Sequence, residues 1–473
     1  MSKASTAEVA GDNASAGALL ASSRIAPGPT GLPLLGVLPD IIRHRGILPA
    51  LLHVWQMYGD VVQSKIGLTT TLFFARPEAV QRILVDNRDN YPRAKEAMRS
   101  VARFLGEGLV SSEGAHWRRQ RHFMQGPFAA SAVPNYAPAI VSATNDLLRS
   151  WEQRLHAGDT DLDMLDEAEA LTLDVLGRTI FGFDTRADAR DVGQTFVEVV
   201  DYMRRHLYGL IPSFSWLPTP DNRRLDRNVR HLQDLLDQMI ATRRGAPDTY
   251  GFDADLLSVM LRARDEWGEG MLEHHLRDEV MTLYLAGHQT SSELISWVFY
   301  ALDKHPDVER ALREELAAVL GGREPGLRDV EHLPYTRMVV DEALRMYPPA
   351  PLVTKNARHA DVVEGYAVPA GALVVLSPYI TQRHPAVWAD PESFDPSRHA
   401  PENAASRHRL AFFPFSAGYH SCIGSSFALL EVRLAVAAIA QRYRLRRLPG
   451  PSVELDVTRT LTPSGLRMRL EPW

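Results

Sequence analysis

The longest helical pattern in the sequence covers residues 271–303 and contains no proline. Its apolar side chains recur at helical spacing, and the pattern stops just before His305-Pro306, where proline disfavours helical geometry in the residue before it. A helix of roughly 30 residues, rising about 1.5 Å per residue, is as long as a domain is wide. The sequence therefore predicts a helix that crosses the whole domain.

The N-terminal part predicts a stiff opening followed by a small β region. Prolines in 27–36 exclude both a helix and a central strand there, because proline has a fixed φ and no N–H donor. Residues 48–58 then indicate a helix, and 60–75 indicate two short strands around a glycine. The Ala/Ser-rich residues 1–25 are expected to be disordered.

The rest of the chain predicts a mainly α fold with small β-sheets. Most of 77–347 has helical spacing, whereas 361–376 indicates strands around tight turns. A helix from about Ser425 to Tyr443 precedes short C-terminal strands. No repeat, low-complexity tract or linker divides the chain, so we expect residues 26–473 to form a single domain.

Composition excludes several classes of protein. Hydrophobic residues make up 45% and charged residues 23%, as in a globular protein with a large core. The net charge is −6 and the pI about 6.3, without a long basic tract, so no nucleic-acid partner is expected. No apolar run approaches the ~20 residues of a membrane span, and no signal peptide is recognisable. We expect a cytoplasmic protein, most simply a monomer.

Cys422 is the only cysteine, so an intrachain disulfide is impossible. It lies between Gly418 and Gly424, just before a predicted helix whose N-terminus favours thiolate over thiol. The glycines permit backbone angles and close approaches that a side chain would block. A lone cysteine is by itself more often a small buried hydrophobe.

The surrounding residues, from Phe415 to Gly424, decide between these interpretations. They resemble the haem-binding signature of cytochromes P-450, Phe-x-x-Gly-x-(Arg or His)-x-Cys-x-Gly, at every fixed position. The resemblance implies a P-450 fold, a triangular prism with haem b between the long helix and the cysteine loop. It makes Cys422 the proximal thiolate ligand, His420 a donor to a haem propionate, and Phe415 a packing partner that shields the sulfur.

Ala286 and Gly287 lie near the middle of the predicted long helix, followed by Gln289 and Thr290. A glycine there costs about 1 kcal/mol relative to alanine, which suggests either room for a ligand or a crossing of two helices. The family's motif at this place is Ala-Gly-x-(Glu or Asp)-Thr. It implies that Thr290 hydrogen-bonds dioxygen or the water that delivers protons. Gln289 departs from the motif and cannot carry a proton, although water or Glu293 could substitute.

Two further clusters follow from the resemblance. Glu342 and Arg345, one helical turn apart, together with Arg398 in a Phe-x-Pro-x-Arg segment, correspond to the family's buried ionic triad, which serves folding and haem retention. Trp117 and Arg121 correspond to a Trp-x-x-x-Arg motif that binds a haem propionate. Lys355 is a further candidate for that role, with Arg358 as its competitor.

The implied function is a monooxygenase that inserts one oxygen atom from O2 into an apolar small molecule, such as a fatty acid, terpenoid, steroid or polyketide. Apolar residues in variable segments are expected to line the substrate pocket, namely Leu283, Leu352, Val353, Phe214 and Leu461.

No flavin or iron–sulfur segment accompanies the haem region, so electrons are expected from a ferredoxin with its reductase or from a flavodoxin-type donor. Arg118, Arg119 and Arg433 could form a basic docking face. The alternatives are a haem-thiolate peroxygenase or isomerase, which Gln289 favours and Thr290 opposes, and a non-catalytic haem-binding sensor.

Overall fold

The structure is a computed structural model that describes residues 23–182, 195, 198–199, 219–245, 255–265, 268–450, 453–456 and 460–473. The chain folds into two compact units. The first unit contains Met1–Ala97, Ala350–Ser393 and Ser406–Cys422, and the second contains Met98–Pro349, Phe394–Ala405 and Ile423–Trp473. Each unit is described by itself below.

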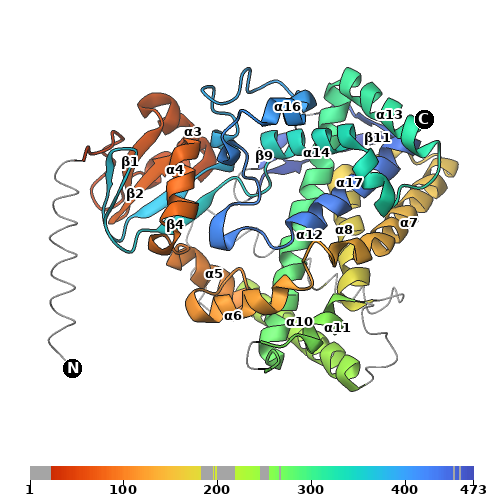
Figure 1. The fold of residues 1–473 in the computed structure, drawn as a ribbon, viewed down its shortest axis with the longest axis horizontal. Helices are drawn as coiled ribbons and strands as arrows, with labels where there is room; N and C mark the ends of the chain where they lie inside the picture. Colours follow the sequence, from red (N-terminus) through yellow and green to blue (C-terminus); the bar gives the residue numbers. More distant parts are fainter. Residues whose placement is uncertain are drawn as a thin grey trace. The chain divides into compact units, whose positions relative to one another are not determined.

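The first unit is built on a four-stranded sheet with the strand order β1-β2-β7-β4. β1 (Val61–Ile66) and β2 (Thr69–Phe74) form an antiparallel hairpin. β2 pairs in parallel with β7 (Leu373–Leu376), which pairs antiparallel with β4 (Val353–Asn356). The sheet therefore joins strands that are far apart in the sequence, the red and the blue-green ribbons of Figure 1.

Short elements surround this sheet. They are α2 (Leu38–Arg43), α3 (Ile47–Tyr58), α4 (Pro77–Gln81), η1 (Arg82–Asp86), η2 (Arg88–Asn90), β5 (Asp361–Val363), β6 (Tyr366–Val368), α15 (Pro378–Thr381), η7 (Arg409–Ala411) and η8 (Gly418–His420). β5 and β6 form a separate antiparallel hairpin. The core of the unit is apolar, and Leu72, Phe74, Val374 and Leu376 are all 0% exposed within it.

The second unit is helical. Its elements are α6 (Gly114–Gln125), η3 (Val133–Tyr136), α7 (Ala137–His156), α8 (Met164–Phe181), α10 (Pro220–Gly245), α11 (Leu256–Arg262), α12 (Glu273–Lys304), α13 (Pro306–Leu320), η5 (Leu327–His332), α14 (Pro334–Met346), η6 (Pro396–His399), α16 (Pro401–Ala404) and α17 (Ser425–Arg442). α5 (Lys95–Leu105) contains the boundary between the units. The second unit also contains two small antiparallel sheets, with the strand orders β3-β11-β8 and β10-β9. The strands are β3 (Asp161–Asp163), β8 (Tyr443–Arg447), β9 (Glu454–Asp456), β10 (Thr462–Ser464) and β11 (Arg467–Pro472).

α12 is the central helix of the second unit. It packs against α8, α17, α14, α13, α10 and α11, and Figure 1 shows it alongside α8. Its last residue precedes His305, whose φ of −124° and ψ of 77° are not helical, and Pro306 then begins α13. Along its length apolar residues such as Val280, Met281 and Trp297 are buried.

The predicted elements agree well with the observed ones. The mainly α class with small sheets is confirmed, and so are the long helix, the strands of 60–75 and the C-terminal helix. β4 was not predicted, because its four residues carry no alternation. Within the expected disordered segment 1–25, residues 1–22 lie outside the described residues, whereas Arg24 forms a bridge to Tyr366. The single domain over 26–473 stays a prediction.

None of the helices in the described ranges is both long enough and apolar enough to span a membrane.

Candidate functional site

The cysteine loop lies in the first unit and is closed by its own backbone. The amide of Cys422 donates to the carbonyl of Phe415 at 2.9 Å, which folds the loop back on itself. Ser416 and Gly418 both adopt positive φ, 60° and 70°, and make the turn possible. The Cys422 side chain is exposed, so the small-buried-hydrophobe interpretation of this cysteine does not hold.

Gly418 is required by the way the loop packs. A Cβ atom at this position would fall 1.8 Å from the carbonyl oxygen of Leu84, in the π-helical turn η1. The close approach at this glycine is therefore to backbone. Gly424 differs, because the nearest heavy atom to a Cβ there is a ring carbon of Phe128 at 4.0 Å. Gly424 is also the residue that precedes α17, so the helix begins three residues after the cysteine.

Lys355 and His420 meet beside the cysteine loop. The Nζ of Lys355 lies 3.1 Å from Nδ1 of His420, and Lys355 is only 4% exposed. Arg358, its competitor, is exposed, and its backbone amide donates to the carbonyl of Asn90. Two groups that can carry positive charge thus converge within the first unit, a donor set suited to a carboxylate.

In the second unit, α12 runs through residues 286–290 without a break. Ala286 is exposed, whereas Leu285 and Gly287 on either side of it are half-buried. Gly287 faces α8, where a Cβ would come within 3.0 Å of the Leu176 side chain, so this glycine serves the crossing of two helices. The Thr290 hydroxyl donates to the carbonyl of Ala286 at 2.7 Å, a bond that loosens a helical turn.

Gln289 belongs to a network around the buried side chain of Glu293. Its amide donates to Glu293 at 3.1 Å and to the Thr460 hydroxyl at 2.8 Å. Thr460 and Thr462 each donate to the same Glu293 oxygen at 2.6 Å. Sequence reasoning named Glu293 and missed its two threonine partners, since no local pattern links residues 293 and 460.

Glu342 and Arg345 form a fully buried bidentate ion pair on α14. Arg345 donates to the two Glu342 oxygens at 2.7 and 2.8 Å, and both residues are 0% exposed. Arg398 approaches Glu342 to 3.6 Å, and His399 lies 3.0 Å from it. Burial alone would raise the pKa of Glu342, but the bonds from Arg345 and His399 outweigh it and hold that pKa below its ordinary value. His399 was not predicted.

Other predicted residues are placed as follows. Trp117 is buried on α6 and Arg121 is half-buried one turn later, as their spacing predicts. Leu461 is 0% exposed, and its carbonyl accepts from the Trp297 indole at 2.5 Å, so it is a core residue. Leu283, Leu352 and Val353 are half-buried. Phe214 lies outside the described residues.

The expected basic docking face is largely neutralised within the chain. Arg119 forms ion pairs with Asp265 at 2.8 Å and Glu269 at 3.0 Å. Arg433 lies 3.7 Å from Asp341, and burial lowers its pKa. Arg118 is exposed.

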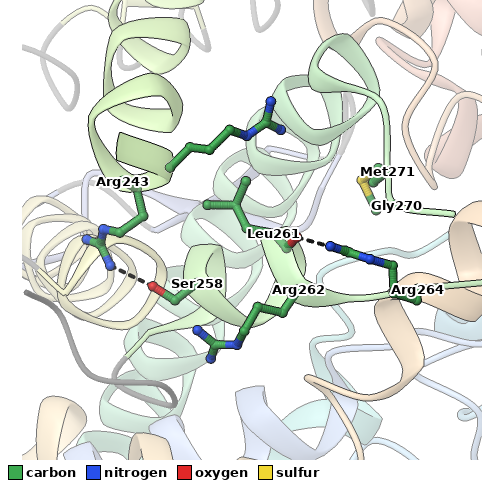
Figure 2. Close-up of a pocket in the computed structure, with 8 residues that line it drawn as sticks. Arg243, Ser258, Leu261, Arg262, Arg264, Gly270 and Met271 are labelled. Carbon is green, nitrogen blue, oxygen red and sulfur yellow. Dashed lines mark hydrogen bonds between the residues drawn. The ribbon is translucent and has the colours of Figure 1, made fainter. Parts of the chain in front are cut away.

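A cavity of about 380 Å³ in the second unit contains none of the predicted site residues. Four arginines line it together with Ser258, Leu261, Gly270 and Met271. Figure 2 shows that the guanidinium groups of Arg243, Arg262 and Arg264 do not converge. Arg243 donates to Ser258, and Arg264 donates to the Leu261 carbonyl. The arrangement therefore does not form an anion site.

A family model described as cytochrome P450 matches residues 26–467. The chain belongs to the cytochrome P450 family. It is 34% identical over 456 residues to cyclooctatin synthase of Streptomyces melanosporofaciens, with 95% of each chain covered. It is also 34% identical over 453 residues to cyclooctat-9-en-7-ol 5-monooxygenase of the same organism, with 94% of each covered. The P450 is thus a monooxygenase, as its sequence predicted.

A solved structure confirms the fold of this P450. The crystal structure of the cytochrome P450DA heme domain covers 95% of the chain, with 98% of that domain matched, at a TM-score of 0.84 and 26% identity. P450 enzymes contain haem, take electrons from a redox partner and act on small molecules.

The residues of the cysteine loop fit this cofactor. The exposed sulfur of Cys422 at the start of a helix suits a metal ligand, and the pair of Lys355 and His420 suits a carboxylate.

Proposed function

We propose that this P450 holds haem b through the thiolate of Cys422 and oxygenates a largely apolar, unsaturated terpenoid. The observation that carries the proposal is the exposed cysteine in a backbone-closed loop directly before α17. The helix N-terminus stabilises the anionic form of the sulfur. When bound, a thiolate-ligated haem supplies the activation of O2 and the transfer of one oxygen atom to substrate.

Lys355 and His420 orient the cofactor in this proposal. Each can donate to a propionate, and the burial of Lys355 strengthens its interaction with an anion. Trp117 and Arg121 on α6 supply an indole N–H and a guanidinium for the same purpose. Phe415 packs as an apolar shield of the sulfur.

Residues in the central part of α12 form the proton relay in this proposal. The Thr290 hydroxyl donates a hydrogen bond to the Ala286 carbonyl. Rotation of this side chain would let the hydroxyl donate to dioxygen or to a water molecule instead. Gln289 cannot release a proton, but it holds the Glu293 carboxylate in place. We assign the acid of the proton relay to Glu293, reached through the hydroxyls of Thr460 and Thr462.

The substrate class rests on the relatives and on the lining. One relative is named for an oxygenation of cyclooctat-9-en-7-ol, an unsaturated alcohol by its name. The candidate lining residues Leu283, Leu352 and Val353 are all aliphatic, which suits a hydrocarbon skeleton with few polar groups. We assign the electron donor as a ferredoxin or a flavodoxin. Because Arg119 and Arg433 are paired internally, its docking would rely on exposed charges such as Arg118.

The first test is the spectrum of the dithionite-reduced protein with carbon monoxide, for the wild type and Cys422→Ala. A strongly red-shifted Soret band in the wild type that is absent from the folded variant supports thiolate ligation. Its absence from the folded, haem-loaded wild type would refute the proposal. A screen of terpenoid hydrocarbons and alcohols for a shift in the haem spin state then identifies the substrate.

The alternative is a haem-thiolate peroxygenase or isomerase, which the presence of Gln289 favours. Turnover of a spin-shifting ligand under 18O2, with a surrogate ferredoxin and reductase, distinguishes a monooxygenase from a peroxygenase, an isomerase and a sensor. A monooxygenase consumes reducing equivalents and incorporates label from O2. A peroxygenase takes the oxygen from peroxide, an isomerase incorporates none, and a sensor shows no substrate-dependent consumption.

A further inference from the structure

The second unit brings two imidazoles and a carboxylate together at the start of α12, away from the residues used above. Glu107, His116 and His275 each offer one ligand atom, and these atoms all lie within 4.8 Å of one another. The rings of His116 and His275 have centroids 4.6 Å apart. Glu107 is exposed and both histidines are half-buried, so an ion in solution can reach them. We refer to these three residues as the His–Glu cluster.

Each member of the cluster comes from a separately anchored segment. Glu107 lies in the loop between α5 and α6, and its backbone N–H donates to the Asp278 carboxylate at 2.9 Å. The N–H of Leu109 in the same loop donates to Glu279 at 3.1 Å. α12 therefore fixes this loop at the end where His275 lies, while His116 lies in the first turn of α6.

The hydrogen bonding of His116 suits a metal ligand. Its Nε2 lies 3.0 Å from the backbone carbonyl of Glu107. In the tautomer that makes this bond, Nε2 carries the hydrogen and Nδ1 keeps its lone pair. Metal-binding histidines are usually oriented by such a bond from the other ring nitrogen.

The cationic charge of Arg119 beside the cluster is partly neutralised by two acidic side chains. Arg119 is the neighbouring cationic side chain on α6, and Asp265 and Glu269 pair with it at 2.8 and 3.0 Å. Two imidazole nitrogens and one carboxylate oxygen suit Zn²⁺ and its neighbours, whereas Mg²⁺ and Ca²⁺ prefer oxygen ligands throughout.

We propose that Glu107, His116 and His275 form a binding site for a divalent transition-metal ion, with Zn²⁺ as the test ion. Bound metal joins the loop after α5 to the first turns of α6 and α12. Because the site would exist only in the folded protein, the ion stabilises the fold. The site does not use the haem, so its test is independent of the function proposed above.

The test is equilibrium dialysis of tag-free holoprotein against Zn²⁺, with the bound metal quantified by mass spectrometry. We expect one ion per chain, and a loss of affinity of at least about tenfold for His116→Ala and for His275→Ala. The matched control is His274→Ala, whose ring centroid lies 4.1 Å from that of His275 at an interplanar angle of 52° but which lies outside the cluster. Circular dichroism and the Soret band establish that each variant is folded.

A thermal unfolding scan supplies the second readout. Zn²⁺ should raise the Tm of the wild type and of His274→Ala, and leave the Tm of the double variant His116→Ala/His275→Ala unchanged. The proposal fails if the wild type binds no more Zn²⁺ than the double variant, or if His274→Ala weakens binding as much as His275→Ala.

Discussion

Gln289 donates its side-chain amide to the buried carboxylate of Glu293 at 3.1 Å, one turn further along α12. An amide at this position can donate a hydrogen bond but cannot release a proton. The glutamine that departs from the family motif is thus part of a defined network, in which it orients an acid that lies one turn away. Residue 289 is therefore constrained by Glu293.

Gln289→Glu is expected to make stability fall with rising pH. Two carboxyl groups about 3 Å apart cannot both ionise without strong repulsion, so one pKa rises in the folded state. The folded protein then keeps a proton that the unfolded chain releases, and the free energy of unfolding of the variant decreases between about pH 5 and pH 8 relative to the wild type. Urea unfolding of the variant and of the wild type at about pH 5 and about pH 8 measures the difference in their free energies of unfolding. An equal difference at the two pH values would contradict the repulsion.

Thr462→Val is expected to destabilise the fold by about 1–3 kcal/mol, because it removes a donor at 2.6 Å from a buried carboxylate without changing side-chain shape much. The control is Thr69→Val on β2, where the side chain is exposed and the change should stay within about 0.5 kcal/mol. Urea unfolding of both variants provides the comparison. Equal effects would mean that the bond to Glu293 contributes nothing specific.

Glu431→Gln should stabilise the protein at alkaline pH. Burial raises the pKa of Glu431 to about 8. Below about pH 8 the folded state holds a proton that an unfolded glutamate releases near about pH 4.3. Each unit by which the pH rises between these values therefore lowers the free energy of unfolding by up to about 1.4 kcal/mol. The variant lacks this loss at position 431. Its unfolding free energy should fall less steeply from about pH 5 to pH 8, and parallel curves for variant and wild type would refute the raised pKa.

Gly418→Ala and Gly424→Ala should behave differently although both glycines belong to the signature. At 418 the new Cβ meets the Leu84 carbonyl at 1.8 Å, and the φ of 70° adds about 1–3 kcal/mol of strain. At 424 the nearest atom is 4.0 Å away and φ is −84°. We expect much lower haem content per chain for Gly418→Ala only. Equal haem content in the two purified variants would count against this packing.

Arg345→Leu is expected to destabilise the second unit by about 3–5 kcal/mol, because it leaves the fully buried Glu342 without its bidentate partner. Arg244→Leu serves as the control, since its ion pair with Glu273 is exposed and contributes at most about 1 kcal/mol. Chemical denaturation of both variants measures the difference. A small effect at Arg345 would mean that Glu342 accepts a proton or another donor instead.

Local patterns predicted most of the fold of this P450. Local patterns located α3, β1, β2, α12 and α17 to within one or two residues at most boundaries, because residues such as Gly67 and Pro306 mark where these elements end. The sequence did not predict β4. Its four residues form a strand through pairing with β7, a contact that no local pattern encodes.

The site divides in the same way. The sequence by itself predicted that the Thr290 hydroxyl bonds a backbone carbonyl and that Glu342 and Arg345 lie on one helix face, because spacing along a helix fixes which groups lie together. Only the tertiary structure decided that His399 joins this pair, that Thr460 and Thr462 bind Glu293, and that Gly418 packs on Leu84. These contacts join residues distant in sequence, and packing of whole elements, rather than any local pattern, brings them within reach.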